Sequence, residues 1–307
     1  FLSNYSIQRT YPAPLIVCKN FGFFGSISIF FLNLVIITSI DLSCDIFDIF
    51  PISDYAIRIQ YYDDMNAKFE DGYFPITISN IDDKRVSANV AYLTMEVRAR
   101  KNFSILDRAE VQRLNFKGTR ITGVTLRSPA GEFTISANQV IVCSGALHSP
   151  AILMRSGIGP AAHLSGLGID VVADRAGVGQ NLMEHPGVSI ASYMKRPARL
   201  PKSMRRQMIA CMRYSSGIEG CGPGDMFIVP TNKSAWHPLG DRIGASMVWV
   251  NNSFSTGTVS LASADPAIEP SVDFNMCSDE RDLTRIIRAT RMLVRMHDRA
   301  AVRAAAA

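Results

Sequence analysis

The spacing of apolar and polar residues predicts a helix and then a series of short strands in the first half of the chain. Residues 84–93 carry their apolar side chains on one side at helical spacing. Short apolar runs follow at 103–106, 110–116 and 121–127, and residues 132–136 alternate between polar and apolar. Such runs with turn signals between them predict an antiparallel meander with one face open to solvent.

The run at 139–143 differs because its apolar residues are not interrupted. This pattern predicts a strand covered on both faces, as in the parallel sheet of an α/β domain, with Cys143 as a small buried apolar residue. The strand leads into the small residues 144–146 and then into a helix at 150–155. Pro150 suits the first turn of that helix, where its missing N–H would be unpaired anyway.

The pattern changes again near Pro186, which marks a predicted domain boundary. Strands are expected at 245–250 and 258–262, and residues 279–296 form the clearest helix in the sequence. Ser278 is expected to cap this helix. Its apolar stripe predicts ordinary core packing and consists of Leu283, Ile286, Ile287, Leu293 and Val294.

Residues 21–40 carry no charge and stand apart from the sequence that follows. A helix of this length rises ~30 Å, enough to cross the hydrocarbon core of a bilayer. Arg9 and Lys19 precede it, so a membrane span here would place the N-terminus in the cytoplasm. An extension unrelated to the following domain and a buried core segment are the two other interpretations. The localisation stays open, either cytoplasmic or membrane-associated if 21–40 is a span.

Composition and charge narrow the class of protein. The chain is 47% hydrophobic and 19% charged, as in globular proteins, and its net charge is +5. The positive charge is densest at 195–213, which fits a solvated surface or a site for an acidic partner. No nucleic-acid motif occurs. The six cysteines lack C-x-x-C spacing, and no group of histidines, cysteines and carboxylates has metal-ligand spacing, so no metal site is predicted.

Two motifs identify a family resemblance. Residues 145–159 read GALHSPAILMRSGIG, and residues 177–186 read GVGQNLMEHP. Both resemble signatures of the glucose–methanol–choline (GMC) family of flavin-dependent oxidoreductases, in the family's order. Glu184 stands where that family usually has aspartate and keeps the carboxylate. Weaker similarity extends the resemblance over 61–297.

The resemblance implies an α/β (α+β) fold. It would contain a partial FAD-binding domain of GMC type with an antiparallel meander, and a substrate domain built on an antiparallel sheet. The implied divisions are an N-terminal extension, non-homologous or membrane-like, at 1–60, the partial FAD-binding domain at 61–185, an incomplete substrate domain at 186–297 and a tail at 298–307.

The resemblance also implies FAD as the cofactor. The implied cofactor-binding residues are Val111, Ser144, Gly145, Ala146 and Asn181. A small turn at the carboxyl edge of a parallel sheet is where open α/β folds bind nucleotides. Further glycines of the motifs would let backbone N–H groups approach an anionic ligand; they are Gly157, Gly159, Gly177 and Gly179. We interpret His148 as structural and His185 as a hydrogen-bonding or interface residue.

Two parts of the family pattern are missing from the sequence. No G-x-G-x-x-G turn occurs, and the segment that carries the family's catalytic histidine is not recognisable, so no catalytic residue is assigned. The implied function is oxidation of the CH–OH group of a small-molecule alcohol with hydride passing to flavin, in a chain that is an inactive fragment. The alternatives are a non-catalytic remnant or binding module of the same fold, a membrane-tethered oxidoreductase subunit, and a hydroxynitrile lyase.

Overall fold

The computed structural model describes most of the chain from residue 59 onward and one short strand before it. The described residues are 15–17, 59–82, 84–201, 203–204, 206–235 and 237–306. The possible membrane span at 21–40 and nearly all of the predicted extension at 1–60 lie outside the described residues, and both stay predictions. Within the described ranges, no helix is long and apolar enough to cross a membrane.

The described residues form two compact units, each assembled from separate stretches of sequence. Unit 1 consists of residues 15–17, 92–182 and 256–275. Unit 2 consists of residues 59–82, 84–91, 183–201, 203–204, 206–235, 237–255 and 276–306. The assignment of a cofactor domain to 61–185 and a substrate domain to 186–297 remains a prediction.

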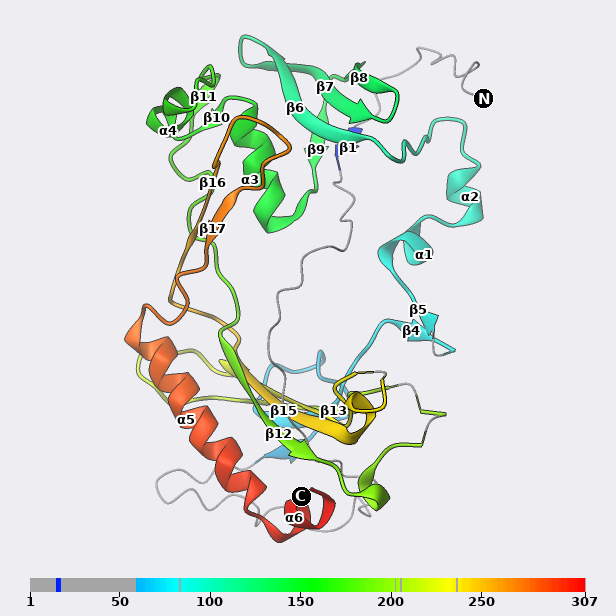
Figure 1. The fold of residues 1–307 in the computed structure, drawn as a ribbon, viewed down its shortest axis with the longest axis vertical. Helices are drawn as coiled ribbons and strands as arrows, with labels where there is room; N and C mark the ends of the chain where they lie inside the picture. The colour runs from blue at the N-terminus through cyan, green and yellow to red at the C-terminus, as the bar shows by residue number, and fades with distance from the viewer. Residues whose placement is uncertain are drawn as a thin grey trace. The chain divides into compact units, whose positions relative to one another are not determined.

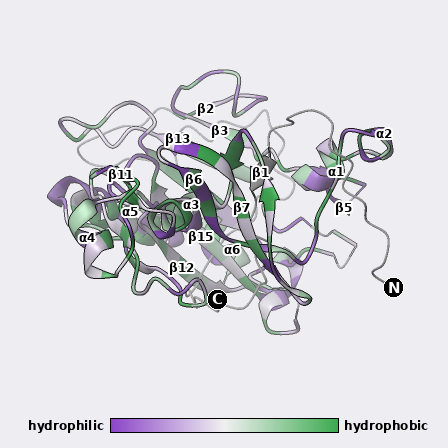
Figure 2. Cartoon of the chain, turned by 90° about the horizontal axis from the view of Figure 1, so that it is seen from above, coloured by the Kyte–Doolittle hydropathy of each residue, from purple (hydrophilic) through white to green (hydrophobic). Residues whose placement is uncertain are grey.

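The antiparallel meander in unit 1 confirms the strands predicted at 110–116, 121–127 and 132–136. It consists of β6 (Glu110–Lys117), β7 (Arg120–Ser128) and β8 (Gly131–Ser136). Figure 2 shows both hydrophilic and hydrophobic residues along β6 and β7. Gly118, with φ +58°, lies in the tight turn between β6 and β7. The strand predicted at 103–106 is wrong, because this segment forms no strand, and Ile105 and Leu106 are about half exposed.

The strand and helix that follow the meander are confirmed with two corrections. Strand β9 (Val140–Val142) pairs in parallel with β1 (Leu15–Val17), and helix α3 (Gly145–Arg155) follows it (Figure 1). The prediction that β9 is covered on both faces is wrong, because Ile141 is 40% exposed and Cys143 is exposed. Pro150 lies inside α3 and not in its first turn, because the helix begins at Gly145.

Short elements complete unit 1. They are α2 (Met95–Arg98), β10 (Ile158–Gly159), α4 (Ala161–Gly166), β11 (Ala173–Asp174), β16 (Thr258–Ser260) and β17 (Ser271–Asp273). One core cluster joins α3 to the meander and contains Leu114, Val124, Leu126 and Ile152. The core of unit 1 therefore packs α3 against the meander.

Unit 2 is built on a six-stranded sheet in the order β12-β15-β14-β13-β3-β2. The strands are β2 (Gln60–Tyr61), β3 (Gly72–Pro75), β12 (Gly187–Tyr193), β13 (Ala210–Tyr214), β14 (Met226–Thr231) and β15 (Ile243–Val250). All neighbours are antiparallel except β2 and β3. This sheet and the meander confirm the predicted α/β class with antiparallel sheets.

Helix α5 (Glu280–His297) covers one face of this sheet across β12 and β15 (Figure 1). Side chains alternate along a strand, so Met226 and Ile228 of β14 face the helix while Phe227 and Val229 belong to a cluster on the other face. The second face, without α5, is therefore the one on which aromatic side chains gather.

The helix predicted at 279–296 is confirmed, but its cap and its buried stripe differ from the prediction. Asp279, not Ser278, is the N-cap and accepts a hydrogen bond from the Arg281 N–H at 2.9 Å. Of the predicted stripe, Ile286 and Leu293 are buried, while the other three side chains are 41–51% exposed. The buried face is instead formed by Asp282, Arg285, Ile286, Ala289, Met292 and Leu293.

The helix predicted at 84–93 is mostly wrong. The segment begins with β5 (Lys84–Arg85), which pairs with β4 (Asn80–Ile81) just before it. The only helix in the segment is the short α1 (Ala88–Tyr92), none of whose residues is buried. Because α1 buries none of its residues, the apolar spacing of this segment is not enough to extend the helix over 84–93. The remaining short elements are the 3₁₀ turns at Arg196–Ala198 and Gly240–Arg242 and helix α6 (Ala300–Ala305).

Candidate functional site

The predicted residues 144–146 lie at the start of α3, immediately after β9. Ser144 is the N-cap residue, but its side chain makes no capping hydrogen bond. It is 4% exposed, and its hydroxyl oxygen is buried with no hydrogen-bond partner in the described part of the chain. The Ser144 N–H donates to the Ser149 hydroxyl at 3.1 Å, and this hydrogen bond stabilises the turn.

The start of α3 fits a polar or anionic ligand group. Gly145 has φ +80°, and a Cβ built on it would meet no atom within 4 Å, so the turn opens onto free space. The first N–H groups of a helix have no partner within the helix, and its dipole favours negative charge there. The unpartnered Ser144 hydroxyl adds a donor at the same place. These residues therefore fit the phosphate-bearing cofactor that the sequence implies.

The other two predicted cofactor residues lie on different elements of unit 1. Val111 is half-buried on β6, an edge strand of the meander, beside a β-bulge at Gln112. Gln112 is 3% exposed and its carbonyl oxygen Oε1 has no partner in the described residues, a feature that the sequence did not predict. Asn181 is exposed and has φ +58°. Their contact with a cofactor stays a prediction.

The motif glycines are explained by close packing within the protein. A Cβ on Gly157 would lie 2.4 Å from the Asp170 carbonyl oxygen, and one on Gly179 would lie 2.1 Å from the Val259 carbonyl oxygen. A Cβ on Gly159 would lie 2.9 Å from Cγ of Met154. These three glycines have neighbouring protein atoms where the sequence suggested an anionic ligand. At Gly177 the space is open.

The two motif histidines have structural contacts. His148 is 5% exposed, and its Nε2 lies 3.4 Å from a carboxylate oxygen of Glu269. The Nδ1 of His185 lies 2.8 Å from the Val250 carbonyl oxygen. These contacts support the interpretation of His148 as structural and of His185 as a hydrogen-bonding residue.

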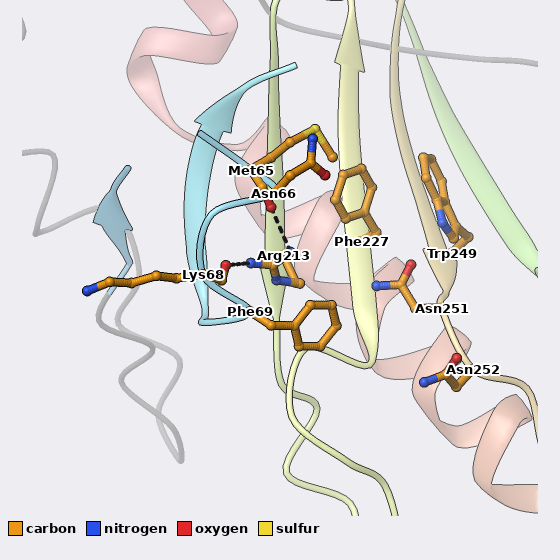
Figure 3. A pocket seen from close by; sticks show the side chains of 9 residues that line it. All are labelled: Met65, Asn66, Lys68, Phe69, Arg213, Phe227, Trp249, Asn251 and Asn252. Atoms are coloured by element: carbon orange, nitrogen blue, oxygen red, sulfur yellow. Dashed lines mark hydrogen bonds between the residues drawn. The ribbon is translucent and has the colours of Figure 1, made fainter. Parts of the chain in front are cut away.

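A pocket that the sequence did not predict lies on the face of the unit 2 sheet that α5 leaves uncovered. Its volume is about 510 Å³ (Figure 3). The lining residues are Met65, Asn66, Lys68, Phe69, Arg213, Phe227, Trp249, Asn251 and Asn252. Arg213, Phe227 and Trp249 are directly opposite one another on β13, β14 and β15. Only the strand register brings these three residues together, so the sequence alone did not show the pocket.

Arg213 holds the loop that forms one side of this pocket. Its guanidinium donates to the carbonyl oxygens of Glu70 at 3.1 Å and Met65 at 3.2 Å, and also to that of Lys68. It lies 4.2 Å from the centre of the Phe69 ring. All three guanidinium nitrogens are thus used by the backbone of residues 65–70.

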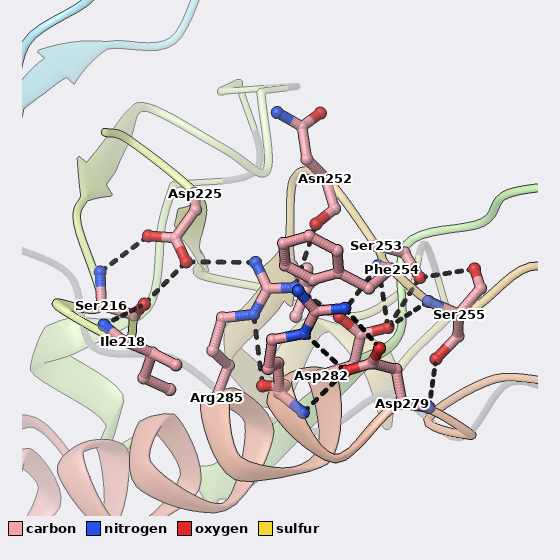
Figure 4. A network of polar contacts seen from close by, with 12 residues as sticks. Ser216, Ile218, Asp225, Asn252, Ser253, Phe254, Ser255, Asp279, Asp282 and Arg285 are labelled. Carbon is pink, nitrogen blue, oxygen red and sulfur yellow. Dashed lines mark hydrogen bonds and ion pairs between the residues drawn. The ribbon is translucent and has the colours of Figure 1, made fainter. Parts of the chain in front are cut away.

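A buried ionic network lies beside the pocket residues Asn251 and Asn252, and Figure 4 shows its polar contacts. Arg285 donates to Asp225 at 3.1 Å, to the Asn252 carbonyl oxygen at 3.0 Å, and to Asp282. The side chains of the three charged residues are at most 2% exposed. Asp225 also accepts from the Asn251 N–H, through its own carbonyl oxygen, at 2.8 Å. The network therefore links α5 to the pocket residues 251–252.

Acid is expected to destabilise unit 2 through Asp282. Burial raises the pKa of Asp282, but hydrogen bonds from Ser255, Phe254 and Ser253 outweigh it and lower the pKa to about 2. The unfolded carboxyl has a pKa of about 3.9. The folded state therefore binds fewer protons, and a stabilisation on the order of 2 kcal/mol, complete above about pH 5, is lost between about pH 4 and pH 2. Urea unfolding of the chain and of Asp282→Asn between pH 2 and pH 6 measures this. Equal acid sensitivity in the two proteins would contradict it.

Two protein-family models match this chain. GMC oxidoreductase models match residues 58–187 and residues 253–307. The chain belongs to the GMC oxidoreductase family. Members of this family are FAD-dependent flavoproteins, as the motifs implied. The matched region 58–187 includes Ser144 and Gly145, so the turn that fits an anionic group lies in the family's N-terminal part.

Among curated relatives of this GMC chain, the 5-(hydroxymethyl)furfural oxidase of Methylovorus sp. (strain MP688) is 40% identical over 237 residues, covering 75% of the chain and 43% of the relative. The oxygen-dependent choline dehydrogenase of Staphylococcus saprophyticus is 30% identical over 253 residues, covering 75% and 45%. The solved structure of pyridoxine 4-oxidase from Mesorbium loti aligns with a TM-score of 0.68 at 25% identity, covering 75% and 46%. The chain spans less than half the length of these relatives.

Proposed function

We propose that this chain is part of an FAD-dependent oxidoreductase that oxidises the CH–OH group of a small-molecule alcohol. The observation that carries the proposal is the start of α3, where Gly145 opens the turn and the Ser144 hydroxyl is buried without a partner. Bound FAD would supply the hydride-accepting chemistry. The chain's own part is to bind FAD through residues 144–146, with Val111 and Asn181 as further proposed contacts.

We propose the pocket of unit 2 as the site for the alcohol. Its aromatic and amide lining is typical of small-molecule sites, which combine apolar walls with a few polar groups. The two curated relatives are named for alcohols of different charge, since 5-(hydroxymethyl)furfural is neutral and choline is a cation. The relatives therefore leave the charge of the alcohol open.

We further propose that these 307 residues alone do not turn over an alcohol. The sequence lacks a G-x-G-x-x-G turn to hold the pyrophosphate, and none of its histidines is assigned as the base that takes the alcohol proton. A non-catalytic binding protein of the same fold would show the same lack of turnover, so flavin binding is the property to test.

Removing the Ser144 hydroxyl is expected to weaken FAD binding without loss of stability. A hydrogen bond to a phosphate oxygen contributes about 1–2 kcal/mol, so Ser144→Ala should raise the dissociation constant for FAD about 5- to 30-fold. Because the hydroxyl has no partner in the described protein, the free energy of unfolding should stay the same or rise. Flavin fluorescence titration measures binding, and urea unfolding measures stability.

Ser149→Ala, which removes the hydroxyl on the inner side of the turn, serves as the matched control. It should lower stability and affect FAD binding less than Ser144→Ala. FAD binding that is unchanged in Ser144→Ala, or no measurable FAD binding by the parent chain, would contradict the proposed cofactor site.

A further inference from the structure

We infer that the pocket of unit 2 selects a neutral, planar, ring-bearing alcohol and discriminates against cationic alcohols. The inference rests on the proposed function and deepens it, because it names the class of substrate that the pocket takes. It is drawn from the arrangement of rings, charges and amides within unit 2 alone.

The floor of the pocket is a row of residues across neighbouring strands. Arg213 pairs with Phe227, Phe227 pairs with Trp249, and glycines lie at both ends of the row, Gly72 opposite Arg213 and Gly187 opposite Trp249. A Cβ on Gly187 would lie 3.0 Å from the Trp249 Cβ, so this glycine leaves room for the indole. The large side chains of the row are therefore confined to the middle of the sheet.

Two of these side chains offer aromatic surface to a ligand. The Phe227 and Trp249 rings have centroids 5.0 Å apart and are inclined by 40°. Phe227 is 8% exposed and Trp249 is half-buried, so the indole is the more accessible of the two. Both point into the same space in Figure 3. A flat ring can stack on or meet these rings edge-on, which favours an aromatic or furan-like ligand over an open-chain one.

The charges around this space disfavour a cation. The lining residues include two cations, Lys68 and Arg213, and no carboxylate. Glu70 and Asp71 do not line the pocket, and their carboxylates accept hydrogen bonds from Tyr62 and Ser215. The Phe69 and Phe74 rings already lie 4.2 and 4.9 Å from the Arg213 guanidinium. The Phe227 and Trp249 rings could attract a cation through their faces, but a cation there would share the pocket with Lys68 and Arg213 and with no carboxylate.

An anionic ligand is disfavoured for a different reason. Arg213 has five N–H groups, and three of them, on Nε and on both terminal nitrogens, already donate to backbone carbonyl oxygens. The side-on fork that would bind a carboxylate through Nε is therefore occupied. The Lys68 side chain extends away from the other labelled residues in Figure 3. The pocket therefore offers a carboxylate neither the side-on fork of Arg213 nor an inward-pointing Lys68 side chain.

The polar groups that remain are three amides, on Asn66, Asn251 and Asn252. The Asn251 side chain donates from Nδ2 to the Gly224 carbonyl oxygen at 2.8 Å, which leaves its Oδ1 as an acceptor for a hydroxyl. An amide can donate to or accept from a neutral hydroxyl without a change of charge. A neutral alcohol on a flat ring therefore matches both the walls and the polar groups of the pocket.

The test uses three ligands that share one ring and differ in charge: benzyl alcohol, benzoate and benzyltrimethylammonium. Binding to the 307-residue chain without FAD is measured by ligand-observed NMR titration. Benzyl alcohol should bind at least tenfold more tightly than either charged ligand. Trp249→Ala should weaken benzyl alcohol binding at least fivefold, while Trp249→Phe, which keeps an aromatic ring, should retain most of it. Lys68→Glu should raise the affinity for benzyltrimethylammonium severalfold.

Equal or tighter binding of the cation would overturn the inference, as would benzyl alcohol binding that does not change in Trp249→Ala. Because no flavin takes part, these outcomes are separate from the FAD titration. If FAD binds as expected while the three ligands bind alike, the cofactor site stands and the inference on substrate class fails. If FAD does not bind while benzyl alcohol is preferred, the proposed function fails and the selectivity of the pocket remains.

Discussion

Arg285→Ala is expected to lower the free energy of unfolding by about 3–5 kcal/mol. The guanidinium is enclosed by protein and links Asp225 on the sheet side to Asp282 on α5. Without it, two carboxylates remain buried and lose their common partner. The cost is large because a buried charge without compensation is much less stable than a hydrated one. Urea unfolding followed by circular dichroism measures the change.

Two further variants separate the ionic network from a general effect on α5. Arg288→Ala removes an exposed arginine one turn away on the same helix, and its effect should stay within about 0.5 kcal/mol. Arg285→Lys keeps the charge but loses the planar fork that reaches Asp225, Asp282 and the Asn252 carbonyl oxygen. It should therefore recover only part of the loss. A small effect of Arg285→Ala, comparable to that of Arg288→Ala, would show that the network does not stabilise unit 2.

Helix α5 shows which structural features the apolar pattern predicts and which it does not. Its 3.6-residue period was sufficient to predict the element and nearly its bounds. The pattern did not predict which side is buried, because hydrophobicity alone assigns Asp282 and Arg285 to solvent. Their burial depends on Asp225, about sixty positions away in sequence, which compensates the arginine. A local pattern contains no information on such a partner.

The two candidate sites differ in the same way. The turn at Ser144 and Gly145 follows a strand in sequence, so one continuous motif was enough to place it at the end of β9. The pocket depends on Arg213, Phe227 and Trp249, which lie on three strands. Their alignment is set by register, which the sequence of any single strand does not contain. The sequence also failed to predict that Cys143 is exposed. Whether other elements pack over β9 is not determined by the sequence of β9 itself.

Gly179→Ala is expected to lower the free energy of unfolding by about 2–5 kcal/mol. The backbone at Gly179 has φ +80°, a conformation that costs alanine about 1–2 kcal/mol. The added Cβ would also lie 2.1 Å from the Val259 carbonyl oxygen, and relieving such a contact in a packed region costs a further 1–3 kcal/mol or so. The Gly179 carbonyl oxygen accepts from the Val259 N–H at 2.7 Å, so the segment cannot move away without losing this hydrogen bond.

Gly177→Ala, two residues earlier in the same motif, is the matched control and should have the opposite sign. A Cβ at Gly177 meets no atom within 4 Å and its φ is not positive, so alanine should leave stability unchanged or raise it by up to about 1 kcal/mol. If instead these glycines serve mainly to admit an anionic ligand, both substitutions would weaken FAD binding and neither would change stability much. Urea unfolding and FAD titration of the two variants therefore distinguish packing of the motif against β16 from a ligand contact. A stability loss at Gly179 alone would assign that glycine to the fold.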